Sequence, residues 1–313
     1  IERYLSQQIT AKNIERAARL AKLQNMPFNR EGWEYILNTY DGYIPVTIKG
    51  IREGTVVDAH NALMVIECHD PKVFWVGGHL EPMLLRMWYP TTVASLSRHI
   101  KYNVIKKYVD KTSDDPNSLV WKLHDFGARA ATSYESSTLG GAAHLLNFAG
   151  SDTDAAIDMI LNLYNIEEFM VGTVPASEHS TITSWGRENE NLAYKNMLDV
   201  FASDTSEYKT PVLACVSDAY DIINAIDNIW GKELKEQILS STTLVAIRPD
   251  SGLPLYMVMM TLQKLENHFG CTINSKGYKV LNNVRVVQGD GVNEDTIEEI
   301  LYYMELQGYS SDN

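Results

Sequence analysis

Charged side chains follow three apolar runs in the second half of the chain. Asp218 follows VLACV, Arg248 and Asp250 follow LVAI, and Asp290 follows VRVV. Short apolar runs bounded by polar and turn residues predict buried strands. In α/β barrels the carboxyl ends of the parallel strands carry the active site, so we expect these side chains to meet at one such edge.

Two other side chains stand directly before predicted helices, and each has two interpretations. Asp152, in GSDT, can cap the following helix, or it can accept a hydrogen bond from an amide or hydroxyl of a ligand. His179, in VPASEHS, can be a structural histidine, or it can accept and pass on a phosphoryl group. The neighbouring Glu178 and the hydroxyl-rich helix start after His179 favour the second interpretation, because backbone N–H groups at a helix start favour anions.

The aromatic and charged residues that follow the other apolar runs also have two possible roles each. Arg248 and Asp250 can pair with each other, or Arg248 can present its planar donors to a phosphate or a carbonyl. Asp218 and Asp250 can hold Mg²⁺ directly or through water, since that ion prefers a few carboxylates plus phosphate oxygens, or each can be a helix cap. Phe126 is either a core residue or a surface on which a flat ring stacks.

The run QGDG at residues 288–291 lies between a predicted strand and a predicted helix. Gly289 permits a close approach of the backbone to a ligand, and Asp290 can hold ribose hydroxyls. The run lacks the third glycine of a dinucleotide-binding fingerprint, so it is weak support for a Rossmann fold. The chain also contains no Walker A loop, HExxH or GxSxG motif.

The residues after Lys111 repeat a pattern of apolar run, polar loop and helical segment. The predicted strands are LVWKL, HLLNF, FMVGTV, VLACV, LVAI and VRVV, and the predicted helices are DAAIDMILNLY, NLAYKNMLDVF, AYDIINAIDNIW and EDTIEEILYYM. Strands that alternate with helices indicate a parallel sheet, and polar side chains at successive strand ends favour a barrel over an open sheet.

The first third of the chain has a different pattern. Residues 1–40 are predicted to be helical with a break at Pro27, and residues 43–70 to form a small β unit from YIPVTIKGI, GTVV and ALMVIE. A helix over residues 75–89 is predicted to stop at Pro90, with Thr91 or Thr92 capping the next helix through Lys107. The polar stretch KTSDDPNS at 111–118 predicts a domain boundary, giving an α+β region over 1–112 and a barrel-like region over 113–313.

Composition narrows the classes of protein and ligand. The 313 residues are enough for a large core, and the formal net charge of −13 argues against a nucleic-acid surface, so an anionic ligand needs local cations. The three scattered cysteines form no disulfide framework, which favours a cytosolic setting. The apolar run at 253–262 is about half the length that spans a bilayer, and the chain opens with no signal-peptide pattern.

These motifs together resemble the type II phosphoribosyltransferase family, in its nicotinate and nicotinamide branch. The motifs are KLHDFGAR, NFAGSDT, VPASEHSTITSWG, VSDAYDI, IRPDSG, SKGYKVL and VVQGDGV, with EGWEYI and WYPTTVA nearer the start. The resemblance implies an irregular (β/α) barrel with a smaller α+β domain, and transfer of phosphoribosyl from phosphoribosyl pyrophosphate to nicotinamide. It also implies Mg²⁺, ATP as phosphoryl donor to a histidine, and a homodimer with shared active sites.

The resemblance also implies roles for individual residues. Phe126 would stack on the pyridine ring, Asp152 would accept a hydrogen bond from the carboxamide, and Arg248 would contact the amide carbonyl or a phosphate. Arg129 would contact a phosphate, and Gly289 and Asp290 would contact the ribose. His179 would carry the phosphoryl group. Acidic groups, here Asp218 and Asp250, suit a ribosyl carbon that becomes cation-like as pyrophosphate leaves. An anionic acceptor at Asp152 suits an amide and repels a carboxylate, which predicts nicotinamide over nicotinate.

The chain departs from the family pattern at both ends. The family's N-terminal segment with a stacking aromatic and its glycine-rich phosphate loop are not in the sequence, so we expect an incomplete barrel. Inside the motifs, Ala128 replaces a usual aromatic and Ala214 a common small hydroxyl. Two alternatives therefore stay open: a nicotinate phosphoribosyltransferase, and an inactive binding or interaction protein.

Overall fold

The computed structural model describes residues 4–313 and divides into two compact units. The first unit ends at Tyr89, and the second is Pro90–Asn313. Helix α4 begins just before this division. Among the described residues, no helix is long and apolar enough to span a membrane.

The first unit combines helices with one antiparallel strand pair. Its elements are α1 (Ala11–Leu23), α2 (Arg30–Thr39), β1 (Val46–Gly50), β2 (Met64–Cys68), a 3-10 turn η1 (Pro71–Val73) and α3 (Val76–Leu85). β1 and β2 pair with Ile48 opposite Ile66, and a small core forms around Ile36, Val73 and Leu80. The two early helices with a break near Pro27 and the small β unit are confirmed among the described residues, whereas GTVV lies in a loop and not in a strand. Residues 1–3 of the predicted helical stretch lie outside the described residues.

The second unit is a mixed α/β structure with short parallel strands. Its helices are α4 (Trp88–His99), α5 (Lys106–Thr112), α6 (Tyr134–His144), α7 (Asp154–Tyr164), α8 (His179–Thr183), α9 (Glu190–Phe201), α10 (Ile222–Asn224), α11 (Lys235–Ser240), α12 (Pro254–Phe269) and α13 (Glu294–Leu306). Its 3-10 turns are η3 (Pro116–Trp121), η4 (Gly127–Ala130) and η5 (Arg187–Asn189), and its π-helical stretches are η2 (Ile100–Ile105) and η6 (Ala225–Glu233). Its strands are β3 (His124–Asp125), β4 (Gly150–Ser151), β5 (Val212–Val216), β6 (Leu244–Arg248), β7 (Cys271–Ile273), β8 (Lys279–Leu281) and β9 (Val284–Val286).

The strands pair in parallel in two groups. β3 pairs with β4, and the order β5-β6-β9 makes a second sheet, while β7 and β8 form an antiparallel pair. Isolated parallel bridges join Gly150 to Gly172 and Ala176 to Ala214. The segment 172–176 therefore links the edge of β4 to the edge of β5, and the parallel pairings run from β3 to β9.

Three predicted strands are confirmed and three are wrong in their position. VLACV, LVAI and VRVV form β5, β6 and β9. LVWKL is mostly the 3-10 turn η3, because Asp115 caps a turn that begins at Pro116, and the strand follows it at β3. HLLNF is the end of α6 and a turn before β4, and FMVGTV makes only the bridge at Gly172.

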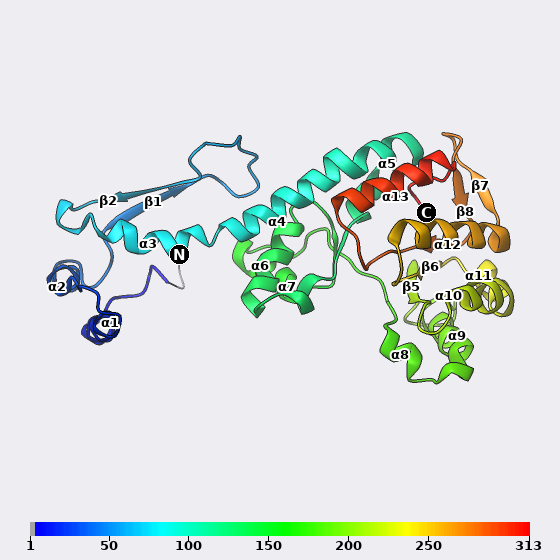
Figure 1. Cartoon of the computed structure of the whole chain (residues 1–313), viewed down its shortest axis with the longest axis horizontal. Coiled ribbons are helices and arrows are strands. Elements are labelled where there is room, and N and C mark those ends of the chain that lie inside the picture. The colour runs from blue at the N-terminus through cyan, green and yellow to red at the C-terminus, as the bar shows by residue number, and fades with distance from the viewer. Residues whose placement is uncertain (1–3) are drawn as a thin grey trace. The chain divides into compact units, whose positions relative to one another are not determined.

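The helices before residue 113 also differ from the prediction. Pro90 lies in the first turn of α4, where its missing N–H interrupts no helical hydrogen bond. Thr91 and Thr92 lie inside α4 and do not precede it. The π-helical stretch η2 and helix α5 lie beside α13 (Figure 1), where Lys107 of α5 pairs with Glu298. Residues 90–112 thus pack with the second unit, although the sequence placed them before a boundary at 112.

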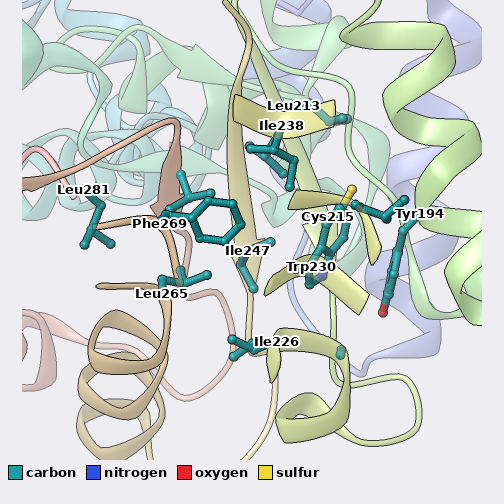
Figure 2. Packing of buried hydrophobic residues seen from close by; sticks show 14 of the residues in the cluster. Tyr194, Leu213, Cys215, Ile226, Trp230, Ile238, Ile247, Leu265, Phe269 and Leu281 are labelled. Carbon is teal, nitrogen blue, oxygen red and sulfur yellow. The ribbon is translucent and has the colours of Figure 1, made fainter. Parts of the chain in front are cut away.

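The main core of the second unit packs on the face of the β5-β6-β9 sheet that carries Cys215, Val245 and Ile247. Figure 2 shows Trp230 and Tyr194 beside Cys215 of β5, with Ile247 of β6 between them and Phe269. The Trp230 and Tyr194 rings stack with centroids 4.4 Å apart. Burying such large side chains fixes β5 and β6, and thereby the positions of the residues that follow them.

Candidate active site

The register of the central sheet aligns three of the candidate residues. Val216 pairs with Arg248, and Ile247 pairs with Val286. Continued past the strand ends, this register places Asp218 level with Asp250, and Asp250 level with Gly289. A Cβ added to Gly289 would lie 3.1 Å from Oδ1 of Asp250, which confirms that the backbone of Gly289 approaches this carboxylate closely.

The smaller strand pair delivers two more candidates in the same way. Asp125 pairs with Ser151, and the backbone N–H of Asp152 donates to the Asp125 carbonyl at 3.0 Å. Phe126 and Asp152 are therefore neighbours at the carboxyl ends of β3 and β4. Since the bridges at 172 and 176 continue the parallel pairings to β5, all of these residues leave their strands on the same edge.

His179, the first residue of α8, contacts the acid that follows β5. Its Nε2 lies 2.9 Å from Oδ1 of Asp218, whose side chain is 5% exposed while that of His179 is 47% exposed. An ionised carboxylate can only accept, so in the neutral imidazole Nε2 carries the proton and Nδ1 has the lone pair. No hydrogen bond occupies Nδ1 within residues 4–313, so this nitrogen can act as a nucleophile.

Arg248 and Asp250 form the ion pair that the sequence offered as one alternative. The guanidinium donates to Oδ2 of Asp250 at 2.7 Å, and both side chains are mostly buried, 14% and 17% exposed. Nε of Arg248 is buried and has no partner among the described residues. The pair fixes Arg248 at the strand end and leaves part of its donor set unused.

Asp152 does not cap the helix that follows it, because Thr153 occupies the N-cap position of α7. The Asp152 carboxylate instead accepts two hydrogen bonds at Oδ1. His124 donates from Nε2 at 2.9 Å, and the hydroxyl of Thr173 is the second donor. The Asp152 side chain is 41% exposed and can meet a ligand.

Phe126 and Arg129 are accessible. Phe126 is 41% exposed, so it is not the core residue of the alternative interpretation. Arg129 lies exposed in η4 and has no ion pair within the described part of the chain. Asp290 is exposed too, and its carbonyl accepts a hydrogen bond from Gln288 at 2.9 Å.

Three residues at this edge were not predicted as site residues. His124 and Thr173 hold the Asp152 carboxylate, and Asp125 accepts hydrogen bonds from the Gly127 backbone at 2.8 Å and the Thr153 hydroxyl at 2.7 Å. His124 and Asp125 stand in the HDF run and could have been found from it. Thr173, inside the run FMVGTV, gave no distinct sequence signal.

The carboxylates at this edge suit a cation that is shared with a ligand. Within residues 4–313, no group of three or more His, Cys, Asp or Glu side chains is arranged to hold a metal ion. Asp250 keeps Oδ1 free of hydrogen bonds in the described structure, and Asp218 lies level with it. One or two carboxylates completed by phosphate oxygens and water are a usual environment for Mg²⁺.

Buried groups behind the edge are structural. Burial raises the pKa of Cys215 to about 12, so this thiol stays protonated at neutral pH and is no nucleophile. A hollow of about 380 Å³ lies between α8 and α9, lined by residues such as Ile182, Trp185 and Met197. None of the predicted site residues lines this hollow, so it is separate from the strand-end site.

The sequence of the second unit matches a known family. Residues 121–311 match the nicotinate phosphoribosyltransferase (NAPRTase) family, and the chain belongs to this family. The resemblance that the motifs indicated is thus confirmed.

The chain is similar to curated relatives that are named nicotinamide phosphoribosyltransferase. It is 46% identical to the one from Xanthomonas campestris pv. campestris (strain 8004) over 311 residues, which are 99% of this chain and 65% of the relative. It is 28% identical to the one from Acinetobacter baylyi (90% of this chain, 58% of the relative) and 29% identical to the one from Mycoplasma pneumoniae (86% and 59%). The chain thus spans less than two thirds of the length of these relatives.

Proposed function

We propose that the protein transfers the phosphoribosyl group of phosphoribosyl pyrophosphate to nicotinamide, giving nicotinamide mononucleotide and pyrophosphate. The observation that carries this proposal is the register of the strands. Continued past the strand ends, it places Asp218 level with Asp250 and Gly289, and Phe126 level with Asp152. The names of the relatives support the choice of reaction.

The nicotinamide site would be made by the smaller strand pair. The exposed ring of Phe126 offers a face on which a pyridine ring can stack. Asp152 has an oxygen, Oδ2, that is free of hydrogen bonds within the described residues and can accept from the carboxamide. Arg248 would meet the amide carbonyl or a phosphate with the donors that Asp250 does not use.

The phosphoribosyl site would be made by the central sheet. Gly289 lets the ribose approach the backbone, and Asp290 would hold its hydroxyls. Arg129, which comes from η4 after the smaller strand pair, would pair with a phosphate. Asp250 and Asp218 would stabilise the cation-like ribosyl carbon and would be the residues that hold Mg²⁺, directly or through water. That ion, when bound, would neutralise charge on the departing pyrophosphate.

His179 would accept a phosphoryl group from ATP. Asp218 supports this role because it keeps the proton on Nε2 and leaves the lone pair of Nδ1 for attack on phosphorus. The P–O bond to ADP would break as the N–P bond forms. Nearly half of the His179 side chain is exposed, 47%, which gives a nucleotide access to it.

The complete fold that goes with this function would be an irregular (β/α) barrel. The contiguous parallel pairings from β3 to β9, with helices between them, support such a barrel. A homodimer with shared active sites would accompany it, as the family resemblance implies.

Formation of mononucleotide tests the proposal. The intact protein, Mg²⁺ and phosphoribosyl pyrophosphate would be incubated with nicotinamide or with nicotinate, with and without ATP. We expect nicotinamide mononucleotide in preference to the nicotinate product, with stimulation by ATP that is lost in His179→Ala. Preference for nicotinate would favour a nicotinate phosphoribosyltransferase, and no product from either base would favour a binding or interaction protein.

A further inference from the structure

One histidine contacts both groups that would bind nicotinamide. Nε2 of His124 lies 2.9 Å from Oδ1 of Asp152, and the imidazole lies against the ring of Phe126 with centroids 4.7 Å apart and planes at 34°. His124 itself is mostly buried, with 21% of its side chain exposed. It therefore lies behind the two candidate ligand-contacting side chains.

The backbone leaves space for this imidazole at one position. His124 pairs with Gly150 across β3 and β4, and a Cβ added to Gly150 would lie 2.5 Å from Nδ1 of His124. Real Cβ contacts are not this short, so a side chain at residue 150 would displace the ring. Glycine at 150 thus allows His124 to lie across the strand pair and reach Asp152.

The two hydrogen bonds to Asp152 determine which oxygen a ligand meets. His124 and Thr173 both engage Oδ1, and no hydrogen bond reaches Oδ2 among the described residues. With Oδ1 held on two sides, rotation of the carboxylate about its Cβ–Cγ bond would break both hydrogen bonds. Oδ2 is consequently the oxygen available to a ligand, in a fixed direction.

We propose that His124 is a positioning and specificity-determining residue for the pyridine substrate. It fixes Oδ2 of Asp152 as the acceptor for the carboxamide N–H, and it supports Phe126 from behind. This inference rests on the proposed function, since it concerns the same nicotinamide site. Because a carboxylate at that fixed position repels the carboxylate of nicotinate, loss of His124 should weaken discrimination between the two bases.

Loss of His124 should affect the binding of nicotinamide more than the chemical step. Asp152 would contact the carboxamide, which does not react, so the hydrogen bond acts equally in the ground state and the transition state. A misdirected acceptor should weaken binding of nicotinamide about tenfold, which corresponds to about 1.4 kcal/mol. His124→Phe should therefore raise KM for nicotinamide about tenfold, with kcat within about threefold of wild type.

Three variants separate positioning from general structure. His124→Phe keeps a ring against Phe126 and removes the donor. His124→Gln offers an amide N–H to Asp152 and should recover part of the affinity. His268→Phe is the matched control. Nε2 of His268, on α12, contacts Asp227 of η6 at 3.1 Å, away from the strand ends, so loss of this histidine should leave KM for both bases unchanged.

The experiment measures kcat and KM of the intact protein for nicotinamide and nicotinate, with melting temperatures to verify folding. We expect the ratio of kcat/KM values to move toward nicotinate in His124→Phe, partial recovery in His124→Gln, and no change in His268→Phe. If wild type is active and folded His124→Phe has the same ratio of kcat/KM values, the role of His124 would be refuted while the proposed function would stand. Wild-type protein that forms mononucleotide from neither base would overturn the proposed function, and this inference with it.

Thr173, the second donor to Oδ1 of Asp152, provides an independent test if His124→Phe does not fold. Thr173→Val removes the other hydrogen bond to Oδ1 with little change in side-chain volume. It should lower the preference for nicotinamide in the same direction. An unchanged preference in folded Thr173→Val would contradict the claim that a held Oδ1 determines specificity.

Discussion

Oδ1 of Asp218 lies 2.9 Å from Nε2 of His179, and this pair joins a buried carboxylate to an accessible imidazole. The Asp218 side chain is fixed at the end of β5, whereas His179 comes from α8, more than 30 residues earlier in the chain. The contact gives the imidazole one tautomer and one orientation. A group held in this way can transfer a phosphoryl group without first paying the entropy of alignment.

Asp218→Asn should lower the ATP-stimulated rate of mononucleotide formation about tenfold or more, since it removes a hydrogen bond to a charged acceptor. The rate without ATP should fall less if Asp218 acts mainly through His179. The same pair predicts that phosphate attaches to Nδ1 of His179, which ³¹P NMR of the phosphorylated protein can establish. Phosphate on Nε2, or an unchanged ATP response in Asp218→Asn, would contradict this role of the pair.

Gly289→Ala tests the close approach to Asp250. The added methyl group would lie 3.1 Å from Oδ1 of Asp250, so the carboxylate must shift slightly, and with it the Oδ2 atom that accepts from Arg248. We expect activity to fall about tenfold, an effect of the size that a small misplacement of a catalytic group has, with little change in melting temperature. Gly78→Ala in α3 is the control, because a Cβ there meets nothing within 4 Å. Equal activities of the two variants would argue against a role for this contact.

Glu190 predicts a pH dependence of stability. Burial raises the pKa of this carboxyl, although Tyr194 donates a hydrogen bond to it and Arg187 lies near. Between pH 4.5, the ordinary pKa of a glutamate, and the raised pKa, the folded state therefore keeps a proton on Glu190 that the unfolded state has lost. Stability falls as pH rises through this window, because the charged form is disfavoured in the folded protein.

Glu190→Gln removes that titration and keeps an acceptor for Tyr194. We expect the free energy of unfolding of the variant to exceed that of wild type at pH 8, and to approach it near pH 4, in urea titrations. The exposed Glu236→Gln serves as the control and should follow the wild-type pH profile. A wild-type-like profile for Glu190→Gln would show that Glu190 does not titrate in this window.

The central sheet could be predicted from the sequence, and the smaller strand pair could not. VLACV and LVAI are buried along nearly their full length, so apolar character alone identifies them. β3 and β4 have two residues each, too few to give a pattern. The apolar side chains beside them, such as Leu119 and Phe148, belong to turns that pack on the helices at Ile105 and Val109.

Only those site residues that directly follow an apolar run could be predicted from the sequence. Polar residues directly after an apolar run identify Asp218, Arg248 and Asp250 without any tertiary information. The contact between His124 and Asp152 depends on the cross-strand register of β3 and β4, which a sequence does not state. The same limit applies to the Thr173 hydroxyl, whose partner is set by the bridge at Gly172.

Trp230 connects core stability to the position of Asp218. Its indole N–H donates to the hydroxyl of Ser217 at 3.0 Å, and Ser217 directly precedes Asp218. The indole is fully buried, so Trp230→Phe loses apolar volume and this hydrogen bond together. We expect the free energy of unfolding to fall by about 2–4 kcal/mol in urea titrations. Activity below the melting temperature should fall as well, because Ser217 is then less firmly held.

The control for this variant is Trp185→Phe, which changes an indole that is 42% exposed. Its free energy of unfolding should stay within about 1 kcal/mol of wild type, as is usual for surface substitutions. Equal losses of stability in the two variants would contradict the role assigned to Trp230. If Trp230→Phe lost stability but kept full activity, the Trp230–Ser217 hydrogen bond would be structural only, and the position of Asp218 would depend on its pairing with His179 and on the β5–β6 register.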